Sequence, residues 1–171
     1  MAISMYAASV PVFIRALRDL DHVLGKGLAH AKARGFDPDV LVNDRLAPDM
    51  LPFKRQITIA CDSAKLCVAR VGGIDAPKFD DTETTGDELR ARIRKTLDFL
   101  ESVRPEQLDG GEDRPVTYPV SPDRKVTVTG LEYLQQRALP NMFFHVSVAY
   151  AILRHNGVPL SKMDFLAKPK A

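Results

Sequence analysis

The stretch LPNMFFHVSVAYAILRHNGVP, residues 139–159, decides the fold of this chain. A proline stands in its first turn, apolar residues recur through it at helical spacing, and Gly157 with Pro159 follows its last turn. This punctuation predicts one helix from about Leu139 to Asn156. Apolar residues occupy most sides of that helix, which predicts that it is buried in a helical bundle.

Two polar residues lie on this otherwise apolar helix. Asn141 and His145 are four residues apart and therefore share one face. Gln56 lies beside the apolar stripe of a second predicted helix, and if the two helices are neighbours the three polar groups converge. Tyr150 offers a further hydroxyl to the bundle interior, although aromatic residues at helical spacing are more often core.

These candidate ligand-binding residues allow two interpretations. An imidazole, an amide oxygen and water can hold a divalent metal such as zinc, nickel or manganese, and His145 is then the metal ligand. Alternatively, a buried histidine and two amides form a hydrogen-bonded network without a metal. We favour the network, because metal affinity at neutral pH usually requires several imidazoles, thiolates or carboxylates.

Three further long helices are predicted from apolar stripes and their end signals. The first is capped by Ser9, has Pro11 in its first turn and ends at Gly35. The second begins at Asp49 and Pro52 and ends at Gly72-Gly73. The third begins at a capping box formed by Thr85 and Glu88 and stops before Pro105. A shorter helix is expected between Asp37 and about Asn43. Four long striped helices in 171 residues predict an all-α four-helix bundle.

The region before the last long helix has a different pattern. The segments PVTYPV and KVTVT alternate and are β-branched, and residues 121–124 join them as a turn, so a small β-hairpin is predicted over residues 115–129. A short helical turn is expected over residues 131–137. We expect one domain over residues 1–171, with Met163 and Phe165 docking the tail and residues 167–171 flexible.

Charge and composition exclude several classes of function. A net charge of +2, without a basic stripe, gives no indication of nucleic acid or an anionic membrane as a partner. The N-terminal segment lacks the pattern of a signal peptide or membrane span, so a cytoplasmic protein is expected. Cys61 and Cys67 are six residues apart on one predicted helix, cannot bridge each other, and are expected as buried thiols. Phosphate-binding, dinucleotide-binding, nucleophile-elbow and H-E-x-x-H motifs are absent from the sequence.

Three segments together resemble a known family. They are RLAPDMLPFKRQITIACDSAK at residues 45–65, LPNMFFHVSVAYAILRHNGVPL at residues 139–160 and KMDFL at residues 162–166. From about Met5 to Leu166 the chain resembles the bacterial domain-of-unknown-function family DUF1993, which is grouped with the DinB/YfiT-like bundles. The resemblance implies an up-down-down-up four-helix bundle, frequently a homodimer, in a superfamily that includes metal-dependent thiol transferases and hydrolases.

The resemblance also implies where a site would lie. Relatives in the superfamily bind a metal through one histidine of the second helix and two spaced H-x-x-x-H on the fourth. Gln56 matches the first of these, and Asn141 with His145 keeps the spacing but only one imidazole. Two functions therefore stay open: a dimeric, non-catalytic or small-ligand-binding protein with a degenerate metal site, which we favour, and a metal-dependent transferase or hydrolase of small thiols or amides. Residues 115–129 could cap the ligand pocket or extend the dimer contact.

Overall fold

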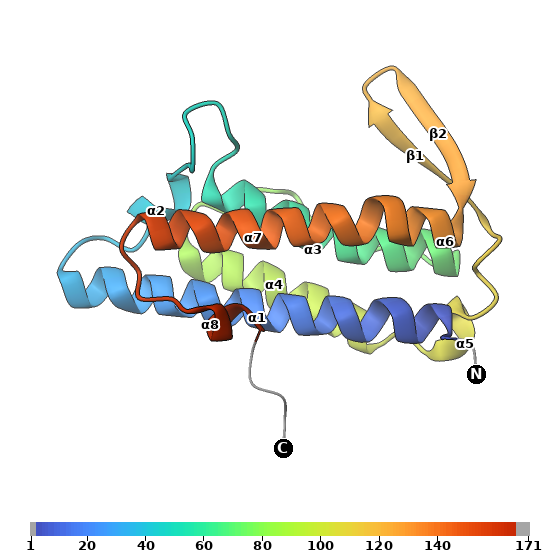
Figure 1. The fold of residues 1–171 in the computed structure, drawn as a ribbon, viewed down its shortest axis with the longest axis horizontal. Coiled ribbons are helices and arrows are strands. Elements are labelled where there is room, and N and C mark those ends of the chain that lie inside the picture. The colour runs from blue at the N-terminus through green and yellow to red at the C-terminus, as the bar shows by residue number, and fades with distance from the viewer. Residues whose placement is uncertain (1–2, 167–171) are drawn as a thin grey trace.

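The computed structural model describes residues 3–166, most of which are helical (Figure 1). In chain order the elements are α1 (Met5–Arg34), α2 (Val40–Asn43), α3 (Phe53–Gly72), α4 (Gly86–Glu101), α5 (Pro105–Leu108), β1 (Pro115–Ser121), β2 (Arg124–Thr129), α6 (Gly130–Tyr133), a π-helical turn (Leu134–Ala138), α7 (Leu139–His155) and α8 (Lys162–Leu166). The predicted long helices and hairpin are confirmed. Within residues 3–166, no helix combines the length and the hydrophobicity that crossing a membrane requires.

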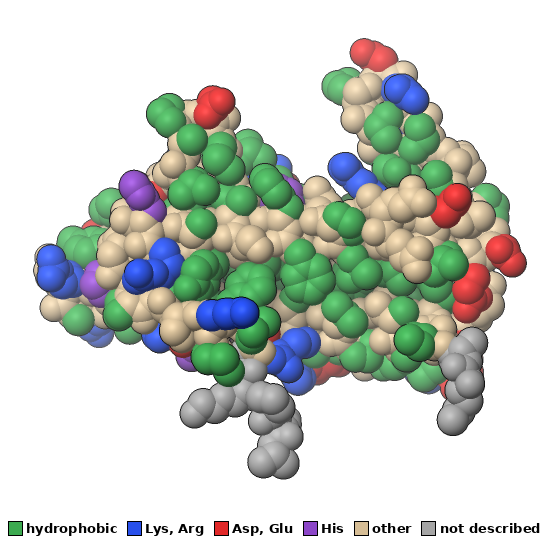
Figure 2. Space-filling view, in the orientation of Figure 1, with side chains coloured by type: hydrophobic (Ala, Val, Ile, Leu, Met, Phe, Trp, Pro, Cys, Tyr) green, Lys and Arg blue, Asp and Glu red, His purple; other side chains and the backbone are tan. Residues whose placement is uncertain are grey.

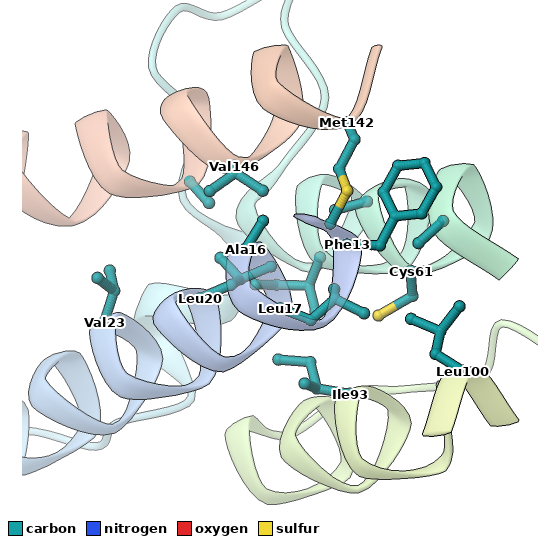
Figure 3. Packing of buried hydrophobic residues seen from close by; sticks show 14 of the residues in the cluster. Phe13, Ala16, Leu17, Leu20, Val23, Cys61, Ile93, Leu100, Met142 and Val146 are labelled. Atoms are coloured by element: carbon teal, nitrogen blue, oxygen red, sulfur yellow. The ribbon is translucent and has the colours of Figure 1, made fainter. Parts of the chain in front are cut away.

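The apolar stripes of the long helices α1, α3, α4 and α7 meet in one core. Figure 3 shows side chains from all four helices converging, among them Phe13, Leu17, Cys61, Ile93, Leu100 and Met142, and each of these is fully buried. Burial of a large apolar side chain contributes about 1.5–3 kcal/mol relative to its exposure to water. The periodicity in the sequence is thus the pattern of this shared core.

Helix α1 begins one turn earlier than predicted. Its N-cap is Ser4, whereas we expected Ser9, and Pro11 lies inside the helix. Two free amides of the first turn are satisfied there, because Ser4 Oγ accepts from the Ala7 amide at 3.3 Å and the Asp109 carboxylate accepts from the Tyr6 amide at 3.0 Å. The additional turn also buries Met5 in the core, which stabilises the earlier start.

The start of α3 corrects a second expectation. Asp49 does not cap this helix; Pro52 is the N-cap residue and makes no side-chain hydrogen bond. The first amide of the helix, that of Phe53, instead donates to the Asp44 carbonyl at 2.8 Å. At the other end Gly73 takes the left-handed conformation with φ 62° and closes the helix, as the glycine pair predicted.

The segment from Ile74 to Thr85 is fastened to α3 and α4 by one buried arginine. The Arg92 side chain is 1% exposed and donates to carboxylates of Asp62, Asp81 and Glu83 at 2.9–3.0 Å. Its guanidinium also lies over the Phe79 ring at 4.3 Å. A buried charge requires such compensation, so Arg92 holds this connection against the bundle. The predicted Thr85/Glu88 capping box is present where α4 begins.

The hairpin stands away from the bundle at the end where α6 begins (Figure 1). Strands β1 and β2 pair antiparallel with Val116 opposite Val128 and Tyr118 opposite Val126. A backbone hydrogen bond joins the segments that enter and leave the hairpin, since the Leu131 amide donates to the Glu112 carbonyl at 2.9 Å. Gly130 passes so close to residue 111 that a Cβ on it would lie 2.0 Å from the Gly111 carbonyl oxygen.

The predicted turn before α7 is part of a longer helical run. Helix α6, the π-helical turn and α7 follow one another without a break from Gly130 to His155, and the Leu139 amide bonds the Leu134 carbonyl five residues before it. Pro140 explains why the π-helical turn lies just before α7, because proline lacks an N–H and its ring displaces the carbonyl four residues earlier. That carbonyl belongs to Gln136, inside the π-helical turn.

The last described element, α8, packs on α1 through one carboxylate. Asp164 accepts from Lys26 Nζ at 2.8 Å and contacts His22 Nε2 at 3.0 Å. Phe165 is half-buried against the core, as predicted, whereas Met163 is 50% exposed and does not dock, contrary to expectation. The flexible tail expected over residues 167–171 lies outside the described residues.

We predict opposite effects for alanine at two glycines. Gly130→Ala forces a methyl group against the Gly111 carbonyl and should lower the free energy of unfolding by about 1–3 kcal/mol. Gly25→Ala, in the middle of α1, places its Cβ 3.8 Å from Arg90 and should raise the free energy of unfolding by up to about 1 kcal/mol. Urea denaturation of both variants measures this, and equal stability of the two would contradict the close approach at Gly130.

Candidate functional site

Three polar pairs cross the contact between α3 and the helical run from α6 to α7. His145 Nδ1 lies 2.7 Å from Gln56 Oε1, Asn141 Nδ2 donates to Ser63 Oγ at 2.7 Å, and Arg70 donates to the Tyr133 hydroxyl. On α3 the three partners are Gln56, Ser63 and Arg70, spaced seven residues apart and hence on one face. We call these three pairs the polar ladder.

The hydrogen bonds of the first pair fix the tautomer of His145. Gln56 Nε2 donates to the Leu51 carbonyl at 2.8 Å, and a carbonyl can only accept. The Gln56 oxygen is therefore the atom that faces the imidazole, so Nδ1 must carry the hydrogen and donate it. Nε2 then holds a lone pair and makes no hydrogen bond within residues 3–166.

The surroundings of His145 keep its imidazole neutral. The residue is 8% exposed, and burial, followed by the positive charges of Arg137 and Arg55, lowers its pKa from 6.5 to about 4. The Phe144 ring stands edge-on to the imidazole with ring centroids 5.2 Å apart. At neutral pH the ring is thus an uncharged donor to Gln56.

The sequence predicted part of this ladder. Gln56, Asn141 and His145 were expected to converge, and the structure brings Gln56 to His145 but gives Asn141 a different partner, Ser63. Ser63 and the Arg70–Tyr133 pair were missed. Two spacings in the sequence could have found them. Polar residues recur every seven positions on α3, and Tyr133, Arg137, Asn141 and His145 follow one another at intervals of four residues.

Tyr150 does not join the other predicted site residues. Five residues separate it from His145, which turns its side chain to a different side of α7. There its hydroxyl donates to the Leu160 carbonyl at 3.4 Å and its ring packs edge-on against Phe165, with centroids 6.0 Å apart. Tyr150 therefore holds the C-terminal segment, and the expectation that it belongs with Gln56 and His145 is corrected.

The donor set does not fit the three-imidazole metal site that the family resemblance implies. The Gln56 oxygen already accepts from His145, and the Asn141 amide is bonded to Ser63. In the part of the chain that the structure describes, no three His, Cys, Asp or Glu side chains gather where a metal could be held. Neutral amides provide no negative charge, so His145 Nε2 is the one strong donor here.

A cleft of about 200 Å³ lies beside the ladder, between α3, the hairpin and the π-helical turn. Its wall carries Ser63, Arg70, Tyr118, Tyr133, Arg137 and Asn141. The Tyr118 and Tyr133 rings are in contact, with centroids 4.8 Å apart. A larger groove of about 390 Å³ lies between α1, α7 and α8, but its lining is almost wholly apolar and it carries no ladder residue. Of these two, the smaller cleft is the one that carries polar side chains together with the ladder residues.

The thiols and the nearby carboxylate do not add a nucleophile to this cleft. Cys61 and Cys67 are buried and unbridged, as predicted, and burial raises the pKa of each thiol to about 12. Asp62 is bonded to Lys65 at 2.8 Å and to Arg92 at 3.0 Å. The cleft is thus equipped for binding rather than for thiol chemistry.

Comparisons with known proteins agree with this architecture. The domain of unknown function DUF1993 matches residues 5–166. A crystal structure of a DinB family member protein from Shewanella denitrificans is 39% identical in sequence, covers 97% of this chain and 93% of its own, and superposes with a TM-score of 0.90. Among curated proteins no significant match is found.

We predict a histidine-dependent loss of stability in mild acid. Because the folded pKa of His145 is about 4 and its ordinary value is 6.5, the unfolded chain binds the proton more readily. The contribution of His145 is complete above pH 6.5 and is lost as the pH falls from 6.5 to 4, by up to about 3 kcal/mol.

Urea denaturation at pH 7.5, 5.5 and 4.5 measures this effect. His145→Gln keeps a donor for Gln56 and should fold without this part of the pH dependence. The control is His155→Gln, an exposed position at the end of α7, which should retain the wild-type profile. An unchanged pH profile in His145→Gln would contradict the neutral buried imidazole.

Proposed function

The chain belongs to the DUF1993 family, and on that premise we propose that it is a homodimeric, non-catalytic protein that binds a small organic ligand in the cleft beside the polar ladder. The proposal includes the up-down-down-up order of the four long helices, which the likeness to a DinB family member supports. The single observation that carries it is the cleft itself, where polar side chains and two tyrosine rings converge.

The residues at the metal-ligand positions that the resemblance implies support ligand binding rather than metal catalysis. The family resemblance matches Gln56 and Asn141 to positions where it implies imidazoles, and both amides are used in hydrogen bonds that hold α3 against α7. Polar side chains that already hydrogen-bond to one another are held in fixed positions. Such a preorganised site favours ligand binding, because its side chains lose little conformational entropy when the ligand binds. Fold is retained across such superfamilies more readily than the chemistry of the site.

One observation favours a second function, a divalent-metal-dependent transferase or hydrolase of small thiols or amides. His145 presents the Nε2 lone pair, and its Nδ1–H is fixed by an amide oxygen, which is the usual arrangement of a metal-ligating histidine. We rank it second because amides in place of two imidazoles leave a weak ligand set.

We predict that the chain binds small organic compounds and not stoichiometric metal. Zinc, nickel or manganese should stay far below one per chain after loading, by elemental analysis. In thermal unfolding, a compound that fills the cleft at 100 times its Kd should contribute about 2.7 kcal/mol. Asn141→Leu, which keeps the size but removes the polar group, should abolish this stabilisation, and Ser147→Ala, at an exposed position of α7, should retain it.

Two outcomes would contradict this proposal. About one metal per chain that is lost in His145→Ala would support the transferase or hydrolase instead. A broad library of neutral and charged compounds that leaves the unfolding temperature unchanged would remove the ligand-binding function.

The proposed dimer uses the face shared by α1 and α7. Figure 2 shows hydrophobic side chains gathered along this face, and the apolar groove between α1, α7 and α8 lies on it. Phe143 is 38% exposed and Leu166 is 44% exposed, both at the groove. A second copy packed there would cover these side chains; a stable interface needs about 800 Å² per partner.

We predict that Phe143→Glu converts the dimer to a monomer, because it places a charge in the apolar interface. Light scattering coupled to size exclusion should give twice the chain mass for the wild type and the chain mass for the variant. Val120→Glu, at an exposed apolar position of the hairpin, is the matched control and should remain dimeric. A monomeric Val120→Glu with a dimeric Phe143→Glu would place the contact on the hairpin instead.

A further inference from the structure

We propose that the cleft beside the polar ladder takes a small organic anion, a carboxylate or phosphate attached to a planar ring, with Arg137 and Arg70 binding the charge and Tyr118 contacting the ring. This inference rests on the proposed function, since it names the class of ligand for the same cleft. Four side chains of the cleft wall support it, the guanidinium groups of Arg70 and Arg137 and the rings of Tyr118 and Tyr133.

The two arginines of the cleft differ from several arginines of the bundle that are held by carboxylates. Arg18, Arg55, Arg90 and Arg92 are each paired with carboxylates. Within residues 3–166, Arg70 and Arg137 form no ion pair: Arg70 donates to the Tyr133 hydroxyl, and the Arg137 guanidinium lies over the Tyr118 ring at 5.9 Å. A guanidinium group has five donors in a planar fork, so both retain donors that suit a carboxylate or phosphate.

The one carboxylate among the described residues of the cleft wall does not cancel this charge. Asp62 is bonded to Lys65 Nζ and Arg92, on the side of α3 that faces α4. The positive field also extends along the ladder, because the charge of Arg137 contributes, after burial, to the lowered pKa of His145. An anion in the cleft would therefore meet two cations whose charge is not otherwise neutralised.

The π-helical turn is what brings these groups to one wall. Twelve residues separate Tyr133 from His145, and in a regular α-helix they would point about 120° apart. The π-helical turn takes up one additional residue, which reduces this difference to about 20°. As a result Tyr133, Arg137 and Asn141 all line the cleft, on the same side as His145. Single π-helical turns inside α-helices are frequent at functional sites.

The hairpin supplies the aromatic wall and limits the size of the ligand. Tyr118 of β1 lies over the cleft between Arg137 and Tyr133, so a planar group can stack on a ring while its acid group reaches a guanidinium. The cleft volume of about 200 Å³ lies below the range of pockets for drug-sized molecules, so a one-ring acid is the appropriate size. Asn141 adds an amide to the same wall.

The test uses acids and neutral compounds that share the same ring. Benzoate is paired with benzamide and phenyl phosphate with phenol, and isothermal titration calorimetry measures each Kd with the full chain. Because a hydrogen bond to a charged group is the stronger kind, each acid should bind about tenfold or more tightly than its neutral analogue. The affinity of the acids should also fall as sodium chloride is raised.

Variants of Arg137 distinguish a loss of anion binding from a loss of folding. Arg137→Gln, at an exposed position, should weaken the binding of benzoate about tenfold or more and leave that of benzamide unchanged, whereas Arg137→Lys should restore part of the loss. The matched control is Arg94→Gln, an exposed arginine of α4 outside the cleft, which should bind benzoate as the wild type does. Thermal unfolding of each variant verifies that it is folded.

The possible failures are distinguishable. An amide or phenol that binds as tightly as its acid overturns the requirement for charge but leaves ligand binding in place. Wild-type affinity for benzoate in Arg137→Gln overturns the assignment of the anion to this cleft. If no acid of the panel binds, the anion inference is overturned, whereas the broader proposal fails only when the neutral compounds also leave the unfolding temperature unchanged.

Discussion

The contact between α3 and α7 is the constraint on which the rest of this structure depends. Both helices are largely apolar, yet each carries polar side chains into the contact, and a buried donor or acceptor without a partner costs about 1–3 kcal/mol. Pairing Gln56 with His145 and Ser63 with Asn141 satisfies these groups at one axial register only. A shift of either helix by one turn would leave the buried imidazole and amides without partners.

The same register determines the form of the cleft. Arg70 lies two turns beyond Ser63 on α3, and its bond to Tyr133 fastens the beginning of the helical run that ends in α7. Tyr133 in turn contacts Tyr118 of the hairpin, and the backbone bond between Leu131 and Glu112 closes the foot of that hairpin. Helix packing, the π-helical turn and the hairpin thus form one continuous wall.

The arrangement also limits the chemistry that this contact can carry. Gln56 and Asn141, which the family resemblance matches to metal-ligand positions, are amides that bond within the protein. A side chain that accepts from a neighbour has less capacity for a metal, and the packing of α3 on α7 gains the hydrogen bonds. The positive charge of Arg70 and Arg137 then lies one to two turns along the same contact.

The sequence by itself determined the long helices, the capping box at Thr85 and the hairpin, because periodicity, turn residues and capping are local signals. It brought Gln56 and His145 together only on the condition that their two helices are neighbours. Tertiary structure decided what depends on distant partners. Ser4 prevails over Ser9 as the cap because Asp109, more than one hundred residues away, satisfies the Tyr6 amide. Tyr150 packs on Phe165, Arg92 is buried among three carboxylates, and the π-helical turn aligns Arg137 with Asn141. A residue's spacing indicates the face it occupies, but its role is fixed by the group that the fold places opposite it.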